Sequence, residues 1–288
     1  MLRTVFLSMA AAGAARPVFA RDAGPQVWTS WFDDPLVAVL LAGVLALYLA
    51  GLATMLSRPH QKWPVGKARV AAFFGALLVL ALALVSPIDA LAEELFSVHM
   101  FQHLLLVLAV GPLLAVSDGH LVVLRAFPLS IRRSIGRAVA GIPGIKQAAH
   151  ETAAAWMAVA FFIATLWFWH IPAAYDWALG NPAVHVCEHV TLIAAAVFFW
   201  RVVLTSGDRR LSPAMAVILV TLVGVQGSFL AALIMFAPRP LYAAYAANGL
   251  DDQALAGVLM CIPASFVYLG STIWALSRMM ANGGHHAG

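Results

Sequence analysis

The sequence predicts an all-α protein, a seven-transmembrane-helix bundle whose N-terminus lies outside and whose C-terminus is cytoplasmic. Composition is the first observation behind this prediction: 62% of the 288 residues are hydrophobic and 10% are charged, whereas a soluble domain carries about 25% charged residues. The second is that the apolar residues fall in runs of membrane length, which requires roughly 20 residues. The third is an uneven distribution of positive charge between the loops.

Seven apolar runs give the predicted helices, in the order 35–56, 70–87, 98–116, 152–172, 184–204, 214–236 and 254–277. Most of the 15 prolines and 21 glycines lie at or near the ends of these runs, so residues 35–277 are predicted to form one membrane domain. Between the third and fourth runs, residues 121–145 alternate apolar side chains with arginines. This pattern is typical of an amphipathic helix at the surface of the bilayer.

The two ends of the chain are predicted to be separate from the bundle. Residues 1–20 have a basic start, an apolar stretch and small residues up to Ala20, which predicts a signal peptide. The alternative is an uncleaved N-terminal segment. Residues 21–34 are then an outer N-terminal segment, and residues 278–288 a cytoplasmic tail.

Positive charge predicts the orientation. Thirteen Lys and Arg residues fall in the loops and helix ends of one side, and Arg21 and Arg239 are the two on the other side after the predicted signal peptide. Loops rich in Lys and Arg stay in the cytoplasm, so we expect a multi-pass protein of the bacterial inner (plasma) membrane. Because these charges lie in short loops between apolar runs, topology explains them, and no nucleic-acid partner is expected.

Five histidines fall at the outer ends of three predicted helices, where ionisable residues are costly and indicate function. The third helix starts in SVHMFQH, with His99 and His103; the fourth ends in LWFWHIP, with His170; the fifth starts in HVCEH, with His185 and His189. Residues four apart lie on one helix face, so each pair points in one direction. Imidazole is a common metal ligand, and the convergence of both pairs with His170 predicts a metal site.

Other side chains are predicted to lie beside these histidines. The candidates are Gln102, Glu188, Asp251, Asp252, Met100 and Met260. Thioether together with imidazole favours copper over hard cations, although methionine also fills gaps in apolar packing, which is the interpretation we favour for both methionines. Cys187 lies two residues from each histidine of its pair and is expected to point away from them.

Four segments, in this order, resemble one known family: SVHMFQHLLLVLAVGPLL, WHIPAAYDWAL, HVCEHVTLIAAAVFFW and DDQALAGVLMCIP. They resemble the multi-pass cytochrome c oxidase assembly factors named for the caa3-type oxidase, over roughly residues 35–277. The resemblance implies a role in maturing a haem–copper oxidase, with its copper-bearing subunit and a copper donor as partners. The family pattern carries over to His99, His103, His170, His185, His189 and Asp252. The sequence departs from this pattern at Gly111 and Cys261, where Pro and Trp are frequent.

Other functions stay open at this point. HVCEH matches a zinc peptidase pattern, with Glu188 as general base, although Gln102 at the corresponding place of the other pair cannot act as a base. A haem b electron carrier could use His103 and His189 as axial ligands, which leaves the other histidines unexplained. A scaffold without metal is the third alternative. The favoured prediction is a copper-binding assembly factor that is not an enzyme.

Overall fold

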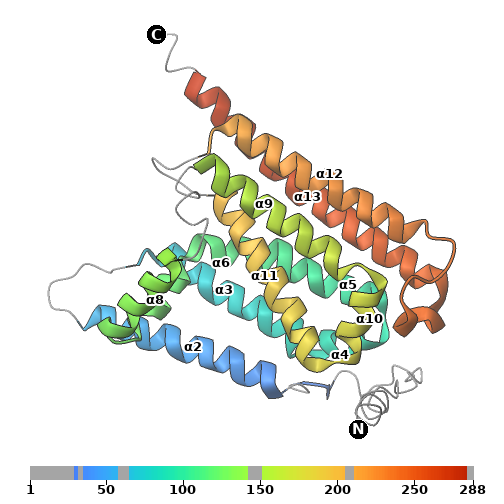
Figure 1. Cartoon of the computed structure of the whole chain (residues 1–288), viewed down its shortest axis with the longest axis horizontal. Coiled ribbons are helices and arrows are strands. Elements are labelled where there is room, and N and C mark those ends of the chain that lie inside the picture. The colour runs from blue at the N-terminus through green and yellow to red at the C-terminus, as the bar shows by residue number, and fades with distance from the viewer. Residues whose placement is uncertain (1–28, 32–34, 58–64, 142–150, 205–210, 284–288) are drawn as a thin grey trace, which may run out of the picture.

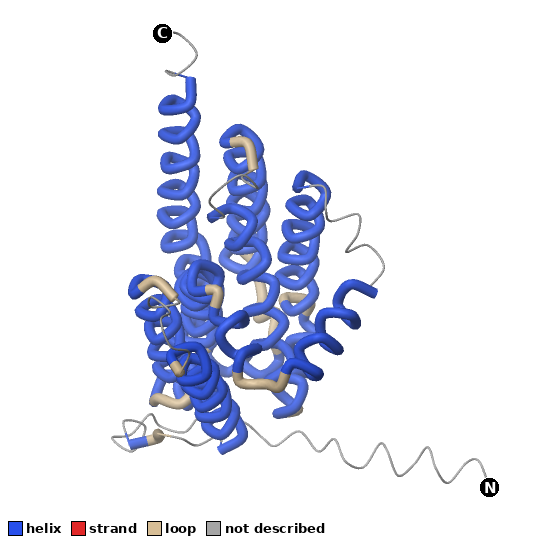
Figure 2. The backbone as a smooth tube through the Cα atoms, turned by 90° about the vertical axis from the view of Figure 1, so that its left-hand side faces the viewer, coloured by secondary structure: helices blue, strands red, loops and turns tan. Residues whose placement is uncertain are grey.

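The computed structural model describes residues 29–31, 35–57, 65–141, 151–204 and 211–283. Within these ranges the regular structure is entirely helical, as Figure 2 shows, and no strand occurs. The predicted signal peptide, most of the predicted outer N-terminal segment and the last five residues of the predicted tail lie outside the described residues.

Seven helical segments are long and apolar enough to cross a membrane, so the prediction of an all-α, multi-pass membrane protein is confirmed. Five of them are single helices: α2 (Pro35–Leu56), α3 (Lys67–Leu84), α9 (Glu151–Trp169), α11 (Pro182–Leu204) and α12 (Pro213–Met235). Their bounds differ from the predicted runs by a few residues at most. The side of the membrane on which each end lies stays a prediction.

The third span is built from three consecutive pieces where the sequence predicted one helix. These are α5 (Phe96–Leu104), the π-helix η2 (Leu105–Val110) and α6 (Gly111–Ser117). Trp200 of α11 donates a hydrogen bond from Nε1 to the Val107 carbonyl within the π-helix, at 2.9 Å. A Cβ at Gly111 would lie 2.7 Å from the Cβ of Ala196. The span therefore packs tightly against α11.

The last span is longer than predicted. After the 3₁₀-helix η4 (Ala243–Asn248), α13 runs over Gly249–Gly283, five residues before the start of the predicted helix and six past its end. Asp251 and Asp252 lie in its first turn, where their negative charge interacts favourably with the positive end of the helix dipole. Gly249 has φ +78°, a conformation that suits glycine at this junction.

Two short helices that the apolar runs did not predict lie at one end of the bundle. They are α4 (Pro87–Glu94) and α10 (Pro172–Gly180), and both have proline in the first turn, a position that proline favours. At the other end lie α7 (Gly119–Arg125) and α8 (Leu129–Gly141), which replace the single amphipathic segment predicted for 121–145. None of the described residues of α8 is buried. Residues 142–145 lie outside the described residues.

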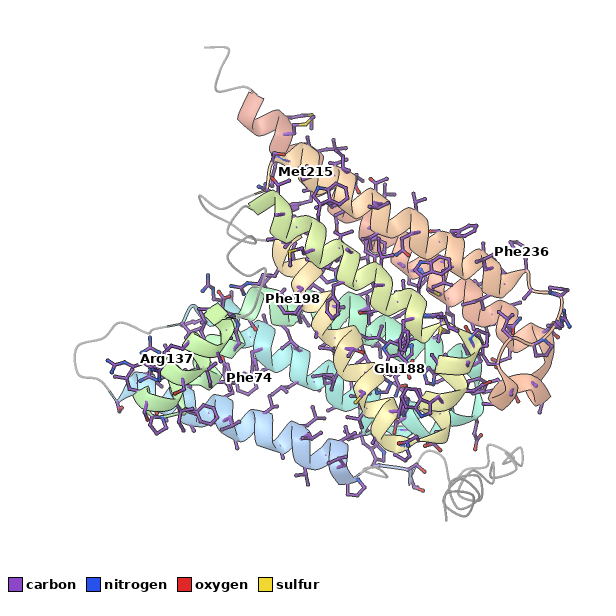
Figure 3. The ribbon with its side chains drawn as sticks, in the orientation of Figure 1. Phe74, Arg137, Glu188, Phe198, Met215 and Phe236 are labelled. Atoms are coloured by element: carbon purple, nitrogen blue, oxygen red, sulfur yellow. The ribbon has the colours of Figure 1, made fainter. Side chains whose placement is uncertain are left out.

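Consecutive spans run in alternating directions through the bundle (Figure 1). In contact with one another are α12 and α13, α13 and α5, α9 and α11, and α11 and α6. The starts of α5, α11 and α13 and the ends of α9 and α12 share one end, here called the histidine end. Figure 3 shows Glu188 at this end and Arg137 of α8 at the other.

At the end opposite the histidine end, an ion cluster ties three segments together. Asp118 precedes α7 with φ +49°, and its carboxylate contacts Arg69 at 2.8 Å and Arg201 at 2.6 Å. Nearby, α2 packs on α7 so closely that a Cβ at Gly51 would lie 1.9 Å from the Val122 carbonyl oxygen.

Candidate metal centre

Two adjacent spans bring four imidazoles together at the histidine end. His99 and His103 of α5 have ring centroids 4.4 Å apart, and His185 and His189 of α11 have centroids 4.3 Å apart. Between the pairs, the centroids of His99 and His185 are 5.5 Å apart and those of His103 and His189 are 5.4 Å apart. His99 is fully buried, and His103 and His189 are each 6% exposed. These four residues are the four-histidine cluster.

Ligand atoms in the cluster lie close enough to share an ion. Two sets have all their ligand atoms within 4.8 Å of one another: His99, His103 and His189, and His99, His185 and Glu188. The Nε2 atoms of His99 and His103 are 3.0 Å apart. Two nitrogens bound at about 2.0 Å to one ion lie at most about 4 Å apart, so this separation fits a shared metal.

Tyr245 of η4 sets the tautomer of His99. The Tyr245 hydroxyl donates to the Ala92 carbonyl and lies 3.1 Å from Nδ1 of His99. A carbonyl can only accept, so the hydroxyl proton is used there, and we infer that Nδ1 of His99 is the donor to the hydroxyl oxygen. Nε2 of His99 then carries a lone pair. A hydrogen bond of this kind orients metal-binding histidines and fixes their tautomer.

Glu188 adds a carboxylate to the same place. Its side chain is 1% exposed, and Oε1 lies 3.6 Å from Nε2 of His103. Neither of its oxygens has a hydrogen-bond partner among the described residues, and the same holds for Nδ1 of His103 and Nε2 of His189. Burying a carboxylate without donors is costly unless a cation balances it. The cluster thus has an excess of lone pairs, which fits a metal cation.

His170 lies at the histidine end but in neither of the two metal-capable sets that the described residues contain. Its Nδ1 lies 2.7 Å from the Leu166 carbonyl oxygen, to which it must donate, and its backbone carbonyl accepts from the Tyr242 hydroxyl at 3.0 Å. Burial lowers the pKa of His170 to about 4, although the hydrogen bond to Leu166 opposes the shift. The ring is therefore neutral near pH 7.

Asp252, which the family resemblance placed among the metal-site residues, has its carboxylate occupied by α5. Its two oxygens accept from the backbone N–H groups of Phe96, at 2.8 Å, and Ser97, at 3.2 Å. The first N–H groups of a helix lack partners within the helix, so Asp252 of α13 caps α5 and holds the helix that carries His99. Asp251 is exposed at the surface.

The remaining predicted neighbours take structural positions. Gln102 points away from the cluster and donates to the Ala83 carbonyl at 2.8 Å and to Asp89 at 2.7 Å. Met100 and Met260 are buried in an apolar cluster with Phe96. Cys187 is exposed, as its offset from the histidine pair predicts.

Sequence reasoning missed the tyrosines that enclose His99. The ring centroid of Tyr175 lies 5.2 Å from that of His99 and the centroid of Tyr245 lies 6.2 Å from it. The chain has five tyrosines, and Tyr175, Tyr242 and Tyr245 all pack in the apolar cluster at this end. This concentration was a usable signal, because a buried hydroxyl needs a partner.

Fold and site together define a multi-pass membrane protein with a buried cluster of metal-capable side chains at one end of its bundle. The sequence model of the cytochrome c oxidase caa3 assembly factors matches residues 46–282, and the chain belongs to this family. Uncharacterized proteins of Mycobacterium bovis and Mycobacterium tuberculosis are each 27% identical to it over 200 residues, which is 65% of this chain. The chain spans 28% of the length of these relatives. No solved structure matches it.

Proposed function

We propose that this caa3 assembly factor binds copper at the four-histidine cluster and assists the maturation of a copper site in the oxidase. The observation that carries the proposal is the meeting, at one point, of four imidazoles with the buried Glu188 carboxylate. Among the described residues, neither oxygen of this carboxylate has a hydrogen-bond partner, nor does Nδ1 of His103 or Nε2 of His189. Imidazole binds copper well, and the family supplies the link to an oxidase that contains copper. Binding and release need no turnover chemistry.

Each side chain has a distinct part in this proposal. His99 offers Nε2 because Tyr245 holds its Nδ1. In the absence of metal, His103 donates from Nε2 to that nitrogen across 3.0 Å, so binding through both Nε2 atoms requires its proton to leave Nε2. His185 and His189 complete the ligand set from α11, and Glu188 balances the charge of the ion.

The location of the cluster supports delivery outside the cytoplasm. Thirteen of the Lys and Arg residues fall in the loops and helix ends opposite the histidine end. Loops rich in Lys and Arg remain in the cytoplasm. The four-histidine cluster then faces the extracytoplasmic side, where the partners are the copper-bearing oxidase subunit and a copper donor. Three of the four rings are buried, and His185 is the partly exposed member of the cluster.

Copper content tests the proposal directly. The full chain, purified in detergent and exposed to Cu(I), is expected to retain copper, and the double variant His185→Gln/His189→Gln is expected to lose the copper held by the cluster. His120→Gln is the matched control, because His120 is exposed and lies in α7, at the opposite end of the bundle from the cluster. Equal copper in the double variant and the wild type contradicts the proposal. A Soret absorption band in protein as isolated from cells would instead support the haem alternative.

The oxidase provides a second readout. In cells that lack the chain, the copper content of the oxidase is expected to fall, and the wild-type chain but not the double variant is expected to restore it. Restoration by the double variant would separate the role in oxidase assembly from copper binding. Glu188→Gln distinguishes the zinc peptidase alternative, since it would abolish hydrolysis.

A further inference from the structure

A small cavity lies inside the bundle next to the four-histidine cluster. Its volume is about 50 Å³ and its wall is formed by α5, η2, α9, α12 and α13. A buried cavity needs about 10–15 Å³ to hold one water, so this one has room for an ion. Gly227 of α12 lines it, and a Cβ added there would meet no described atom within 4 Å. The space is therefore open toward α12.

His170 lines this cavity with its lone pair available. Its Nδ1 lies 2.7 Å from the Leu166 carbonyl oxygen, which can only accept, so the proton is on Nδ1 and Nε2 is the basic nitrogen. Nε2 is buried without a hydrogen-bond partner in the described parts of the chain, and the residue is 7% exposed. A backbone carbonyl at Nδ1 is the arrangement that orients histidines toward metals.

Two thioethers line the same cavity. Met100 of α5 is 2% exposed and Met260 of α13 is 8% exposed. The rest of the wall is mainly apolar, with Phe162 and Leu166 on the side of α9. Thioether is a soft ligand that selects Cu(I) over hard cations. Neutral ligands also suit a monovalent ion, because burying an ion away from water costs more free energy the higher its charge is.

We propose that His170, Met100 and Met260 form a second metal site, specific for a soft monovalent cation of the Cu(I) class. The site goes beyond the proposed function, because it shares no ligand with the four-histidine cluster. Its three ligands are neutral and have lone pairs available, so the ion displaces no proton from them. His103, which also lines the cavity, lies between the two sites.

A groove at the surface of the bundle reaches the same histidine. An open groove of about 680 Å³ runs between the end of α9 and the end of α12, where Trp167, Leu233 and Phe236 contribute to its walls. His170 lines this groove as well as the interior cavity. His170 is thus the residue that the groove shares with the cavity lined by the two methionines.

The test counts Cu(I) bound to the full chain in detergent, by competition with a chromophoric Cu(I) chelator without oxygen. The double variant Met100→Leu/Met260→Leu removes both sulfurs at nearly constant volume, a change that is usually well tolerated. Met215→Leu/Met235→Leu is the matched control, since neither residue lines the cavity. We expect the first variant to bind one equivalent less than the wild type, and the control to bind as the wild type does. Equal binding by the two methionine variants overturns the proposal.

The variant His185→Gln/His189→Gln separates this inference from the proposed function. It is expected to keep the equivalent that the methionine variant loses, and X-ray absorption of that remaining Cu(I) is expected to show sulfur neighbours. A spectrum with nitrogen and oxygen neighbours alone overturns the second site, whether or not the methionine variant folds. If the histidine variant binds as the wild type does while the methionine variant loses one equivalent, the proposed function fails and the second site stands.

Filling the cavity is an independent check on its position. Gly227→Leu leaves all three ligands in place but puts a side chain into the open space, so it is expected to remove the same equivalent. Retention of full Cu(I) binding by this variant places the ion elsewhere and overturns the assignment to the cavity.

Discussion

Replacing Tyr245 by Phe isolates the contribution of one hydroxyl group to copper binding. The hydroxyl is hydrogen bonded to the Ala92 carbonyl and lies 3.1 Å from Nδ1 of His99, and Tyr245 is 5% exposed. Its loss takes one hydrogen-bond partner from a buried carbonyl and one from a buried ring N–H, and a buried polar group left unpaired costs about 1–3 kcal/mol. The preference of His99 for the tautomer with its proton on Nδ1 is then weaker, and the other tautomer places the proton on the nitrogen that faces the cluster.

The expected result is a Cu(I) affinity of the four-histidine cluster lowered about 10–100-fold, the range seen when a hydrogen bond that supports a metal ligand is removed. This corresponds to about 1.4–2.8 kcal/mol. Competition titration of the full chain in detergent measures the affinity, and thermal unfolding measures the stability. Tyr48→Phe is the control, because the Tyr48 hydroxyl is buried without a partner in the described structure and packs on Phe73, away from the site. An affinity for Tyr245→Phe within twofold of the wild type refutes the tautomer argument.

Three further predictions concern other parts of the structure. Asp252→Ala removes the cap of α5 and is expected to cost about 1–2 kcal/mol of stability, measured as a lower melting temperature, while the number of bound copper equivalents stays unchanged. Loss of one equivalent would make Asp252 a ligand instead. Glu188→Gln keeps the shape but removes the charge that balances the ion, so Cu(I) affinity is expected to fall about tenfold, or 1.4 kcal/mol, in the same titration; unchanged affinity would exclude the electrostatic role. Gly51→Ala forces α2 away from the Val122 carbonyl and is expected to lower the stability by about 1–3 kcal/mol. Gly43→Ala lies in the same helix with no described atom near the added Cβ, so it is expected to leave the stability unchanged or to raise it. Equal melting temperatures of the two variants would contradict this packing.

The sequence predicted the spans well because the bilayer imposes a simple rule of length and polarity. The runs at 35–56 and 184–204, for example, agree closely with α2 and α11. Counting spans also put both histidine pairs at the same end, since helices that run in the same direction start at the same end. The i, i+4 spacing then placed His99 with His103 and His185 with His189.

Contacts between distant segments could not be predicted in this way. Asp252 was expected beside the metal, yet it reaches back 156 residues along the chain to the backbone of Phe96. The local sequence around Tyr245 does not predict its hydrogen bond to His99, because η4 is a short 3₁₀-helix between two spans. The short helices α4 and α10 were not predicted either, because both are shorter than the apolar run that a membrane span requires.

The π-helix η2 divides the third span into two parts that face different directions. A π-turn holds one residue more than an α-turn, and each α-helical residue advances the side chains by about 100°. Deleting any single residue between Leu105 and Val110 would restore uniform winding and swing Gly111 away from Ala196, or else turn His103 away from α11. The extra residue therefore rotates α6 relative to α5 about the axis of the span. This rotation lets α5 direct His103 toward α11 while α6 directs Gly111 toward Ala196. Chains of this family that lack this residue should differ from the present one in one of those two contacts.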